Sequence, residues 1–332
     1  MLQRNGSSNH LASATPSETL TPSPPILILV TQQQHQQRQT AKYKMATVAP
    51  SSTDPSLPSP PFVHVSGIPN FRDIGGYPVP SHSRHHSIRT NLLYRCAEPS
   101  RITQDGISTL QNLGITHIYD LRSKNEIARN QNAGRGGVVQ WEGCERVFVP
   151  VFEDQNYSPE ALADRFRDYA SGSSEGFTRA YSEILNGAPR SFRVILLHLA
   201  YQPEKPLVVH CTAGKDRTGL ICALVLALCG VDDEIVAYEY SLTELGLSRE
   251  WKESVMTHLM ENPALQKSLE GTKNMMSSKA ENMLATLKMI REMFGGAEEY
   301  VVEKCGLTRE EVGSIRRNLV IGVPAAHDRL GL

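Results

Sequence analysis

Three short stretches of the chain carry the hydrophobic pattern of β-strands. β-branched and aromatic side chains concentrate at 116–121 (THIYDL) and at 146–152 (RVFVPVF), which predicts a strand in each. A third stretch, 206–210 (PLVVH), is a continuous apolar run that begins at a proline. Because its apolar residues do not alternate with polar ones, we expect a central strand that is buried on both faces.

Helical spacing of apolar residues fills the intervals between these strands. Residues 103–114 repeat apolar positions with helical periodicity and stop at Gly114. Residues 176–200 do the same, with an interruption near Gly187 and Pro189. Strands that alternate with helices predict an α/β fold whose central, mainly parallel sheet is flanked by helices.

The chain becomes mostly helical after Asp232. The segment Leu220–Cys229 is apolar throughout but too short to cross a bilayer, so we expect a core helix and no transmembrane segment. Thr308 and Glu311 have capping-box spacing at the start of the last helix. The other helical segments are predicted at 233–245, 248–262, 279–296, 298–306 and 308–320.

Residues 1–60 have a different composition. They are rich in Ser, Thr, Pro and Gln, and contain no acidic residue between Glu18 and Asp54, which predicts a disordered tail. The apolar stretch Ile26–Val30 is too short for a secretory signal; a transit peptide remains an alternative to a plain tail. Either Met1 or Met45 is the native start. Residues 61–332 are predicted to form one catalytic domain.

Charge and cysteine content exclude several classes of function. A formal net charge of -1 provides no global field for nucleic acid or an anionic membrane, so any affinity for phosphate must be local. The six cysteines lack CxxC spacing, which argues against a zinc site and a disulfide framework. A reducing, cytoplasmic location is expected, with nuclear, membrane-peripheral or organellar placement left open. No obligate partner is implied.

A polar, glycine-containing interruption, CTAGKDR, lies between the strand at 206–210 and the following apolar helix. A loop at the carboxyl end of a strand and the amino end of a helix presents unpaired N–H groups to an anion. Gly214 permits positive φ, and Gly219 is expected to bring the helix close to the sheet. Arg217 adds a planar guanidinium group whose N–H donors can bind two phosphate oxygens at once. These positive groups favour the thiolate form of Cys211.

The motifs HCTAGKDRTG (210–219), NFRDIGGY (70–77), LLYRCAEPS (92–100) and YDLRSKNE (119–126) together resemble the cysteine-dependent, tyrosine phosphatase-like family of secreted bacterial phosphatases and their fungal relatives. The resemblance spans about residues 62–322. It implies a protein-tyrosine-phosphatase-like fold, a phosphocysteine intermediate, and no metal or other cofactor. It also implies activity on phosphotyrosine, in some members on phosphoserine or phosphothreonine, and in several on phosphoinositides.

Residue roles follow from this chemistry. Cys211 is the expected nucleophile, while Cys222 and Cys229 fit buried, inert thiols. Arg217 and the loop amides would hold the phosphate oxygens. The expected substrate-binding residues are Thr212, Ala213, Gly214, Lys215 and Thr218.

Three of the loop's side chains leave alternatives open. Thr218 either hydrogen-bonds the sulfur or caps the helix. His210 is expected to orient the loop through backbone bonds rather than act as an acid or base. Lys215 either pairs with a carboxylate such as Asp216 or attracts further phosphates on an inositol ring.

The general acid is the least determined assignment. Asp216 is preferred because of its place in the loop, although burial or the substrate's charge would have to keep it protonated. Asp154 follows a strand, in a position that suits a mobile acid. Asp120 is the third candidate. For each of them, the alternative is a solvated or ion-paired carboxylate.

The remaining motif residues are predicted to be architectural. Asn70 and Asp73 can hydrogen-bond a turn, and Arg72 can brace a neighbouring loop. Arg95 and Arg122 lie at strand ends, where buried ion pairs are favoured over contact with phosphate.

The sequence thus predicts a protein-tyrosine or dual-specificity phosphatase acting on a phosphoprotein. A phosphoinositide phosphatase is the alternative, and a non-catalytic phosphate-binding module comes third. Pocket depth and width, which distinguish the first two, cannot be read from the sequence.

Overall fold

The computed structural model describes residues 57–80, 86–132, 134, 137–138, 140–152, 159–259 and 268–322. They belong to one compact unit, Val48–Leu332. The predicted tail falls almost wholly outside the described residues, so the boundary near residue 60 stays a prediction.

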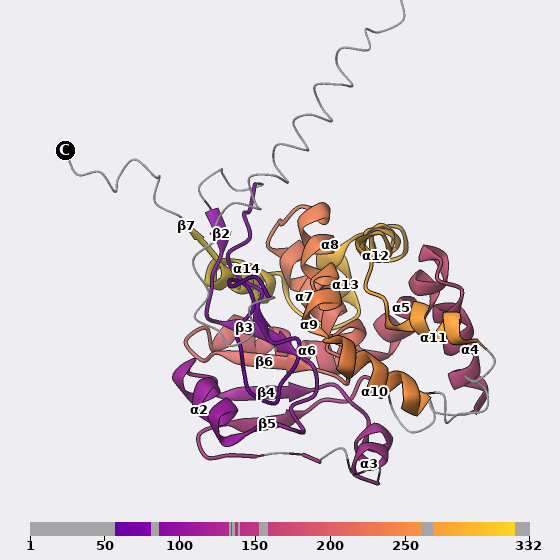
Figure 1. Ribbon diagram of the computed structural model, residues 1–332. Helices are drawn as coiled ribbons and strands as arrows, with labels where there is room; N and C mark the ends of the chain where they lie inside the picture. Colours follow the sequence, from indigo (N-terminus) through magenta and orange to yellow (C-terminus); the bar gives the residue numbers. More distant parts are fainter. Residues whose placement is uncertain are drawn as a thin grey trace, which may run out of the picture. The chain divides into compact units, whose positions relative to one another are not determined.

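A five-stranded sheet forms the centre of this unit (Figure 1). Strand β6 lies in the middle, between β3 and β4, and all of its residues are at most 1% exposed. Strands β3, β6, β4 and β5 run parallel, and β1 is antiparallel to β3. The predicted α/β fold with a mainly parallel sheet is therefore confirmed. The strands, in spatial order, are β1 (Arg72–Asp73), β3 (Leu93–Cys96), β6 (Leu207–His210), β4 (His117–Asp120) and β5 (Glu145–Phe148).

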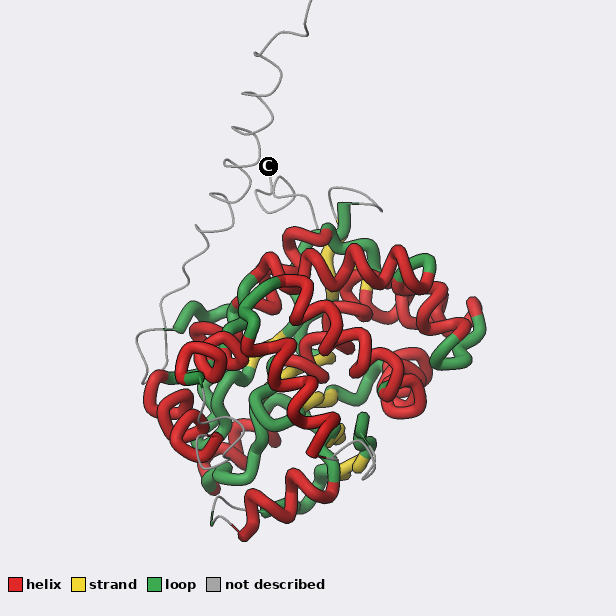
Figure 2. Tube along the Cα trace, turned by 90° about the vertical axis from the view of Figure 1, so that its right-hand side faces the viewer, coloured by secondary structure: helices red, strands yellow, loops and turns green. Residues whose placement is uncertain are grey.

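Helices cover both faces of the sheet (Figure 2). Successive side chains of a strand point to opposite sides, so β6 contributes residues to a hydrophobic core on each face. Leu207 and Val209 of β6 join the larger core, which contains residues of α5, α6, α7, α8 and α12. Val208 faces the other way and packs in a smaller core with Phe71 and with Leu110 of α2. The two-sided burial explains why β6 reads as an uninterrupted apolar run.

The helical C-terminal part is also confirmed. Helix α14 begins with the predicted capping box: Thr308 Oγ1 accepts from Glu311 N, and Glu311 Oε2 accepts from Thr308 N. The helices after β6 are α7 (Asp216–Leu228), α8 (Asp233–Ser241), α9 (Thr243–Gly246), α10 (Arg249–Leu259), α11 (Leu269–Met276), α12 (Ala280–Phe294), α13 (Ala297–Glu303) and α14 (Arg309–Leu319). Within the described part of the chain, no helix is long and apolar enough to cross a membrane.

Among the helices before β6, the hydrophobic pattern predicted α5 and α6, which bury apolar residues, but not α3. The expected break near Gly187 separates α5 from α6, which starts with Pro189 at its first position, where a missing N–H costs nothing. Helix α3 has no buried residue, so it left no apolar periodicity to detect. These helices are α2 (Gln104–Asn112), α3 (Lys124–Asn132), α4 (Pro159–Ala170), α5 (Ser174–Gly187) and α6 (Pro189–Tyr201).

Two expected boundaries were wrong, and helices α4 and α11 and one small sheet were not predicted. The strand expected at 146–152 ends at Phe148, two residues before Pro150, which has no N–H for a ladder. Helix α7 starts at Asp216, two residues before the expected Thr218. Strands β2 (His86–Ile88) and β7 (Val320–Gly322) form a separate antiparallel pair.

Candidate active site

The predicted anion-binding loop lies where the sequence placed it, between β6 and α7. Residues 211–215 connect the carboxyl end of the middle strand to the amino end of a 13-residue helix. Figure 1 shows β6 between its parallel neighbours, so this loop also lies beside the carboxyl ends of β3 and β4. Open α/β folds bind their ligands at this edge.

Four consecutive carbonyl groups of the loop accept hydrogen bonds from donors around it. In a planar trans peptide, the N–H points opposite to the carbonyl of the same peptide. The N–H groups of residues 212–215 therefore point away from those donors and into the loop, forming a nest for an anion. The pairs are His210 Nδ1 with Cys211 O (3.0 Å), Glu98 N with Thr212 O (3.1 Å), Asn70 Nδ2 with Ala213 O (3.1 Å) and Arg95 Nη2 with Gly214 O (2.6 Å).

Gly214 is required by the close approach of the loop to β3. Its φ is +65°, and a Cβ there would lie 2.1 Å from Cys96 O. Gly219 was expected to lie close to the sheet, but its nearest neighbour is a tyrosine of α8. A Cβ at Gly219 would lie 3.0 Å from the ring of Tyr240, so the glycine brings α7 against α8 and not only against the sheet.

Cys211 is 2% exposed at the start of this loop. It is close enough to Arg95 for their charges to interact, and Arg217 is on the first turn of α7. Cys222 and Cys229 differ: burial raises the pKa of each of these thiols to about 12. Both stay protonated at neutral pH, as expected of inert core cysteines.

Arg217 is held by a carboxylate that the sequence analysis did not single out. Glu126 accepts from Arg217 through both oxygens, at 2.6 and 2.7 Å, and from Thr212 Oγ1 at 3.0 Å. Glu126 also accepts from Ser123 N, while Ser123 Oγ accepts from Glu126 N. This is a capping box at the start of α3, so the Ser-x-x-Glu spacing was a usable signal.

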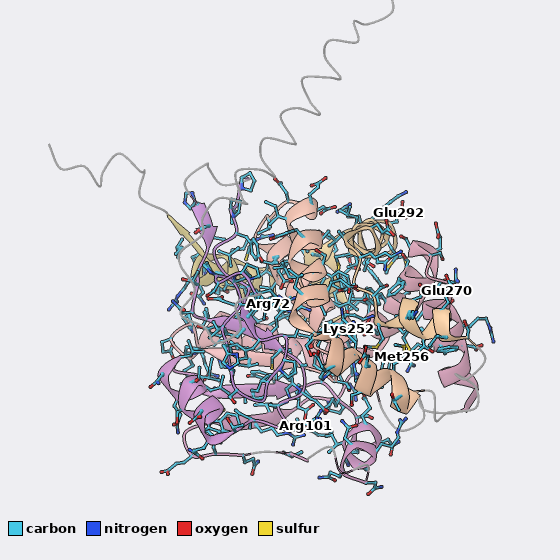
Figure 3. The ribbon with its side chains drawn as sticks, viewed as in Figure 1. Arg72, Arg101, Lys252, Met256, Glu270 and Glu292 are labelled. Carbon is cyan, nitrogen blue, oxygen red and sulfur yellow. The ribbon has the colours of Figure 1, made fainter. Side chains whose placement is uncertain are left out.

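A buried ionic triad lies behind the loop. Arg72 Nε donates to Glu239 Oε1 at 2.8 Å and Arg95 Nη1 to Glu239 Oε2 at 2.6 Å, and each of the three side chains is at most 1% exposed. Arg72 also donates to Thr243 Oγ1 at 3.1 Å. Figure 3 labels Arg72, which lies in the interior of the ribbon. Since the same Arg95 reaches Gly214 O, the triad sets the position of the loop.

His210 faces a second cluster of charges at the ends of β4 and β5. Burial lowers the pKa of His210 to about 4 against the opposing charge of Asp120, so His210 is neutral at pH 7. Its Nδ1 donates to Cys211 O, which is the orienting bond that the sequence analysis expected. Asp120 lies 3.7 Å from its Nε2 and accepts from Arg122 and Arg146, each at 2.8 Å. Arg122 therefore takes part in a buried ion pair, the alternative that was favoured.

The three candidates for the general acid have very different environments. Burial alone would raise the pKa of Asp120, but His210 and the two arginines outweigh it and lower that pKa. A fully buried carboxylate with this bias does not hold a proton at neutral pH. Asp154 lies outside the described residues. Asp216 is 24% exposed on its side chain and accepts from the Tyr181 hydroxyl at 2.8 Å.

Tyr181 is itself part of a buried pair. Its hydroxyl lies 2.6 Å from that of Tyr240, and both rings are fully buried. Burial, together with the charge of Asp216, raises the pKa of both tyrosines, so both hydroxyls remain donors. They fix the orientation of the Asp216 carboxylate.

Lys215 and Thr218 point into the protein. Lys215 is 3% exposed and lies 3.3 Å from Asp216, the carboxylate pairing that was one of its two expected roles. Thr218 Oγ1 is buried and has no hydrogen-bond partner among the described residues, and it does not cap α7. Its other expected role, a bond to the sulfur, stays a prediction.

A model of the tyrosine phosphatase family matches residues 63–321. The chain belongs to this family. The match covers nearly the same residues as the resemblance inferred from the four motifs, and the observed α/β fold agrees with it. The fungal subgroup inferred from the motifs remains an expectation.

Similar proteins carry related names. The triple specificity protein phosphatase PtpB of Mycobacterium tuberculosis is 31% identical over 191 residues, which cover 52% of this chain and 65% of PtpB. The putative tyrosine-protein phosphatase H16_A0669 of Cupriavidus necator is 32% identical over 173 residues, 51% of this chain and 59% of that protein. The tyrosine-protein phosphatase of Nostoc commune is 23% identical over 241 residues, 71% of this chain and 76% of its own. The matched part is thus less than two thirds of the length of the first two.

Proposed function

We propose that this chain hydrolyses phosphate monoesters, with phosphotyrosine in proteins as its main substrate and phosphoserine and phosphothreonine as further ones. The loop after β6 carries the proposal: its carbonyls are bonded from outside, and its N–H groups turn inward beside Cys211. Phosphate oxygens are acceptors that suit inward N–H groups at a helix N-terminus. Membership of the tyrosine phosphatase family and the names of the relatives support the same activity.

In the first step, the sulfur of Cys211 attacks phosphorus. A sulfur–phosphorus bond forms as the bond to the ester oxygen breaks, and the leaving oxygen takes a proton from Asp216. This role requires the charge of the bound phosphate to keep the carboxyl group protonated against its contacts with Tyr181 and Lys215. Arg217 and the loop N–H groups bind the three remaining oxygens, on which the transition state spreads its charge. Glu126 is a positioning residue, because its bidentate bond fixes the plane of the Arg217 guanidinium.

In the second step, water attacks the phosphocysteine. Asp216 accepts a proton from that water as the sulfur–phosphorus bond breaks, so inorganic phosphate leaves and the thiolate is restored. No metal or cofactor takes part in this scheme.

Acid quenching tests the covalent intermediate. We expect a phosphotyrosyl peptide labelled with ³²P to leave label on residue 211 of the wild-type protein. Cys211→Ser should leave none and should lower kcat by at least about a thousandfold. Cys144→Ser, at a half-buried cysteine outside the loop, is the matched control. Normal turnover by Cys211→Ser would refute the mechanism.

The general acid is tested with two leaving groups. Asp216→Asn should lower kcat by about 10²-fold or more for phenyl phosphate, whose leaving group needs a proton, and much less for p-nitrophenyl phosphate. Asp154→Asn is the comparison. If Asp154→Asn gives this pattern and Asp216→Asn does not, Asp154 is the acid.

Phosphoinositide hydrolysis, the alternative from the sequence, depended on a lysine at the rim of the loop. Lys215 is instead 3% exposed and paired with Asp216. No contact among the described residues favours an inositol headgroup over a phosphoprotein.

A further inference from the structure

The ammonium group of Lys215 is surrounded by oxygen atoms of the protein. A lysine has three N–H donors and no acceptor. Its Nζ lies 2.5 Å from Met275 O, 3.0 Å from Ser277 O and 3.3 Å from Asp216 Oδ1. The two carbonyls accept hydrogen bonds from Nζ, and the Asp216 carboxylate forms an ion pair with it.

Aromatic rings close the remaining space around this cation. Lys215 Nζ lies 5.5 Å from the ring centroid of Tyr169 on α4 and 5.2 Å from that of Phe177 on α5, within cation–π range. Both rings are buried, and Lys215 itself is 3% exposed. A substrate phosphate could reach this nitrogen only after α4, α5 and α11 had moved apart.

Lys215 holds the end of a helix. Met275 is in the last turn of α11 and Ser277 is its C-cap, and carbonyls at this position lack partners within the helix and attract cations. The next residue is held by a second group: Ser278 N donates to Glu244 Oε1 at 2.5 Å. Glu244 in turn accepts from Lys252 Nζ at 2.9 Å.

The first contact joins the phosphate-binding loop to the end of α11, and the second, through Glu244 of α9, joins α10 to the residue that follows that end. Figure 3 labels Lys252 and Met256 on α10 and Glu270 on α11, and the two helices lie side by side. Lys215 of the loop bonds the end of α11, and Glu244 of α9 links the next residue, Ser278, to Lys252 of α10.

We propose that Lys215 is a positioning residue that fastens the carboxyl end of α11 to the phosphate-binding loop, and that it does not bind substrate. For its consequence, this inference rests on the proposed phosphatase function: a second phosphate on the substrate gains nothing from Lys215. A preference for a phosphoinositide over a phosphotyrosyl peptide would therefore have to come from other residues.

Two measurements on Lys215→Met test this proposal. The first is amide hydrogen exchange of residues 269–276, which should become roughly tenfold faster because the helix end loses its cation. The second is the ratio of kcat/KM for a phosphotyrosyl peptide to kcat/KM for a soluble phosphatidylinositol bisphosphate. This ratio should stay within about twofold of wild type, even if both values fall because Asp216 is disturbed.

Two further variants distinguish the loss of this contact from a general loss of structure. Lys273→Met removes an exposed charge from the same helix and should change neither exchange nor the ratio. Glu244→Gln weakens the second contact and leaves the residues of the loop unchanged. It should speed exchange in α11 and leave the ratio unchanged, which keeps the test decisive if Lys215→Met fails to fold.

Two results would overturn the proposal: unchanged exchange of α11 in Lys215→Met, or a loss of bisphosphate hydrolysis about tenfold greater than the loss of peptide hydrolysis. Exchange requires no turnover. An inactive wild-type protein would therefore refute the proposed function alone, and the exchange rates would still decide the role of Lys215.

Discussion

Two clusters of buried charge flank the catalytic loop, and they are built differently. Behind the loop, Arg72 and Arg95 share the single carboxylate of Glu239, which leaves one unbalanced positive charge at side chains that are at most 1% exposed. At the ends of β4 and β5, Asp120 binds Arg122 and Arg146, and Arg122 also binds Glu98. There the charges balance, and Arg146 and Glu98 are 18% and 15% exposed.

Their contacts with the loop differ as well. Arg95 donates directly to Gly214 O at 2.6 Å, so the first cluster sets the shape of the anion nest. The side chains of the second cluster come near the loop at His210, which orients the Cys211 carbonyl. We infer that the first cluster affects the shape of the proposed phosphate-binding loop as well as stability, and the second mainly stability.

The largest effect is expected from Glu239→Gln. It leaves Arg72 and Arg95 buried without a compensating charge, which typically costs about 3–5 kcal/mol of unfolding free energy. Urea unfolding of wild type and variant measures the difference. A loss below about 1 kcal/mol would show that the two arginines do not depend on this carboxylate.

The second cluster predicts a dependence of stability on pH. The pKa of His210 falls from 6.5 to about 4 on folding, so the unfolded chain binds its proton more readily. The contribution of neutral His210 is present above pH 6.5 and is lost as the pH falls towards 4, by about 3 kcal/mol at 1.36 kcal/mol per unit.

The variant His210→Asn tests this dependence, because its amide can still donate to Cys211 O but does not titrate. We expect the unfolding free energy of the wild type to fall by that amount more than the variant's between pH 7 and pH 4. Parallel curves for the two proteins would contradict the assignment of a lowered pKa to His210.

Arg95→Lys sharpens the comparison on the catalytic side. The ammonium keeps the charge near Glu239 but cannot bond Glu239 and Gly214 O in the planar geometry of a guanidinium. We expect kcat/KM to fall about tenfold, or about 1.4 kcal/mol, with weaker inhibition by vanadate. Unchanged vanadate inhibition would mean that the loop keeps its shape without Arg95.

The smallest effect is expected from Arg146→Met. This side chain is partly exposed, and Asp120 retains Arg122, so the loss should be about 1 kcal/mol of unfolding free energy. Turnover of p-nitrophenyl phosphate should stay within about twofold of wild type. A larger fall in kcat would show that the second cluster also acts on the loop.

Most of the fold could be predicted because its signals are local in sequence. The apolar run of β6, the break at Gly187 and Pro189, and the Thr308–Glu311 capping box each depend on neighbouring residues. Helix α3 escaped detection because it buries no side chain, and β5 ended early before Pro150. The hydrophobic pattern reflects which residues are buried, so it cannot predict an element that buries none of its residues.

The candidate site could also be predicted only where its signals are local in sequence. The loop from Cys211 to Arg217 could be read directly, since a strand, five intervening residues and a helix fix the geometry. The sequence analysis did not predict roles for Glu126 and Glu239. The Ser-x-x-Glu spacing of Ser123 and Glu126 could have indicated the first of them. Nothing near Glu239 indicates its partners, because Arg72 and Arg95 are 167 and 144 residues away in sequence.

The sequence by itself determined the residues of the proposed site: a cysteine and an arginine at opposite ends of a short loop that leads from a buried strand into a helix. Only the tertiary structure decided which way the charged side chains around that loop point. Lys215 could face a substrate or the protein interior, and it faces carbonyls 60 and 62 residues further along the chain. The physical reason is that a buried cation must find acceptors, and packing, not local sequence, places them.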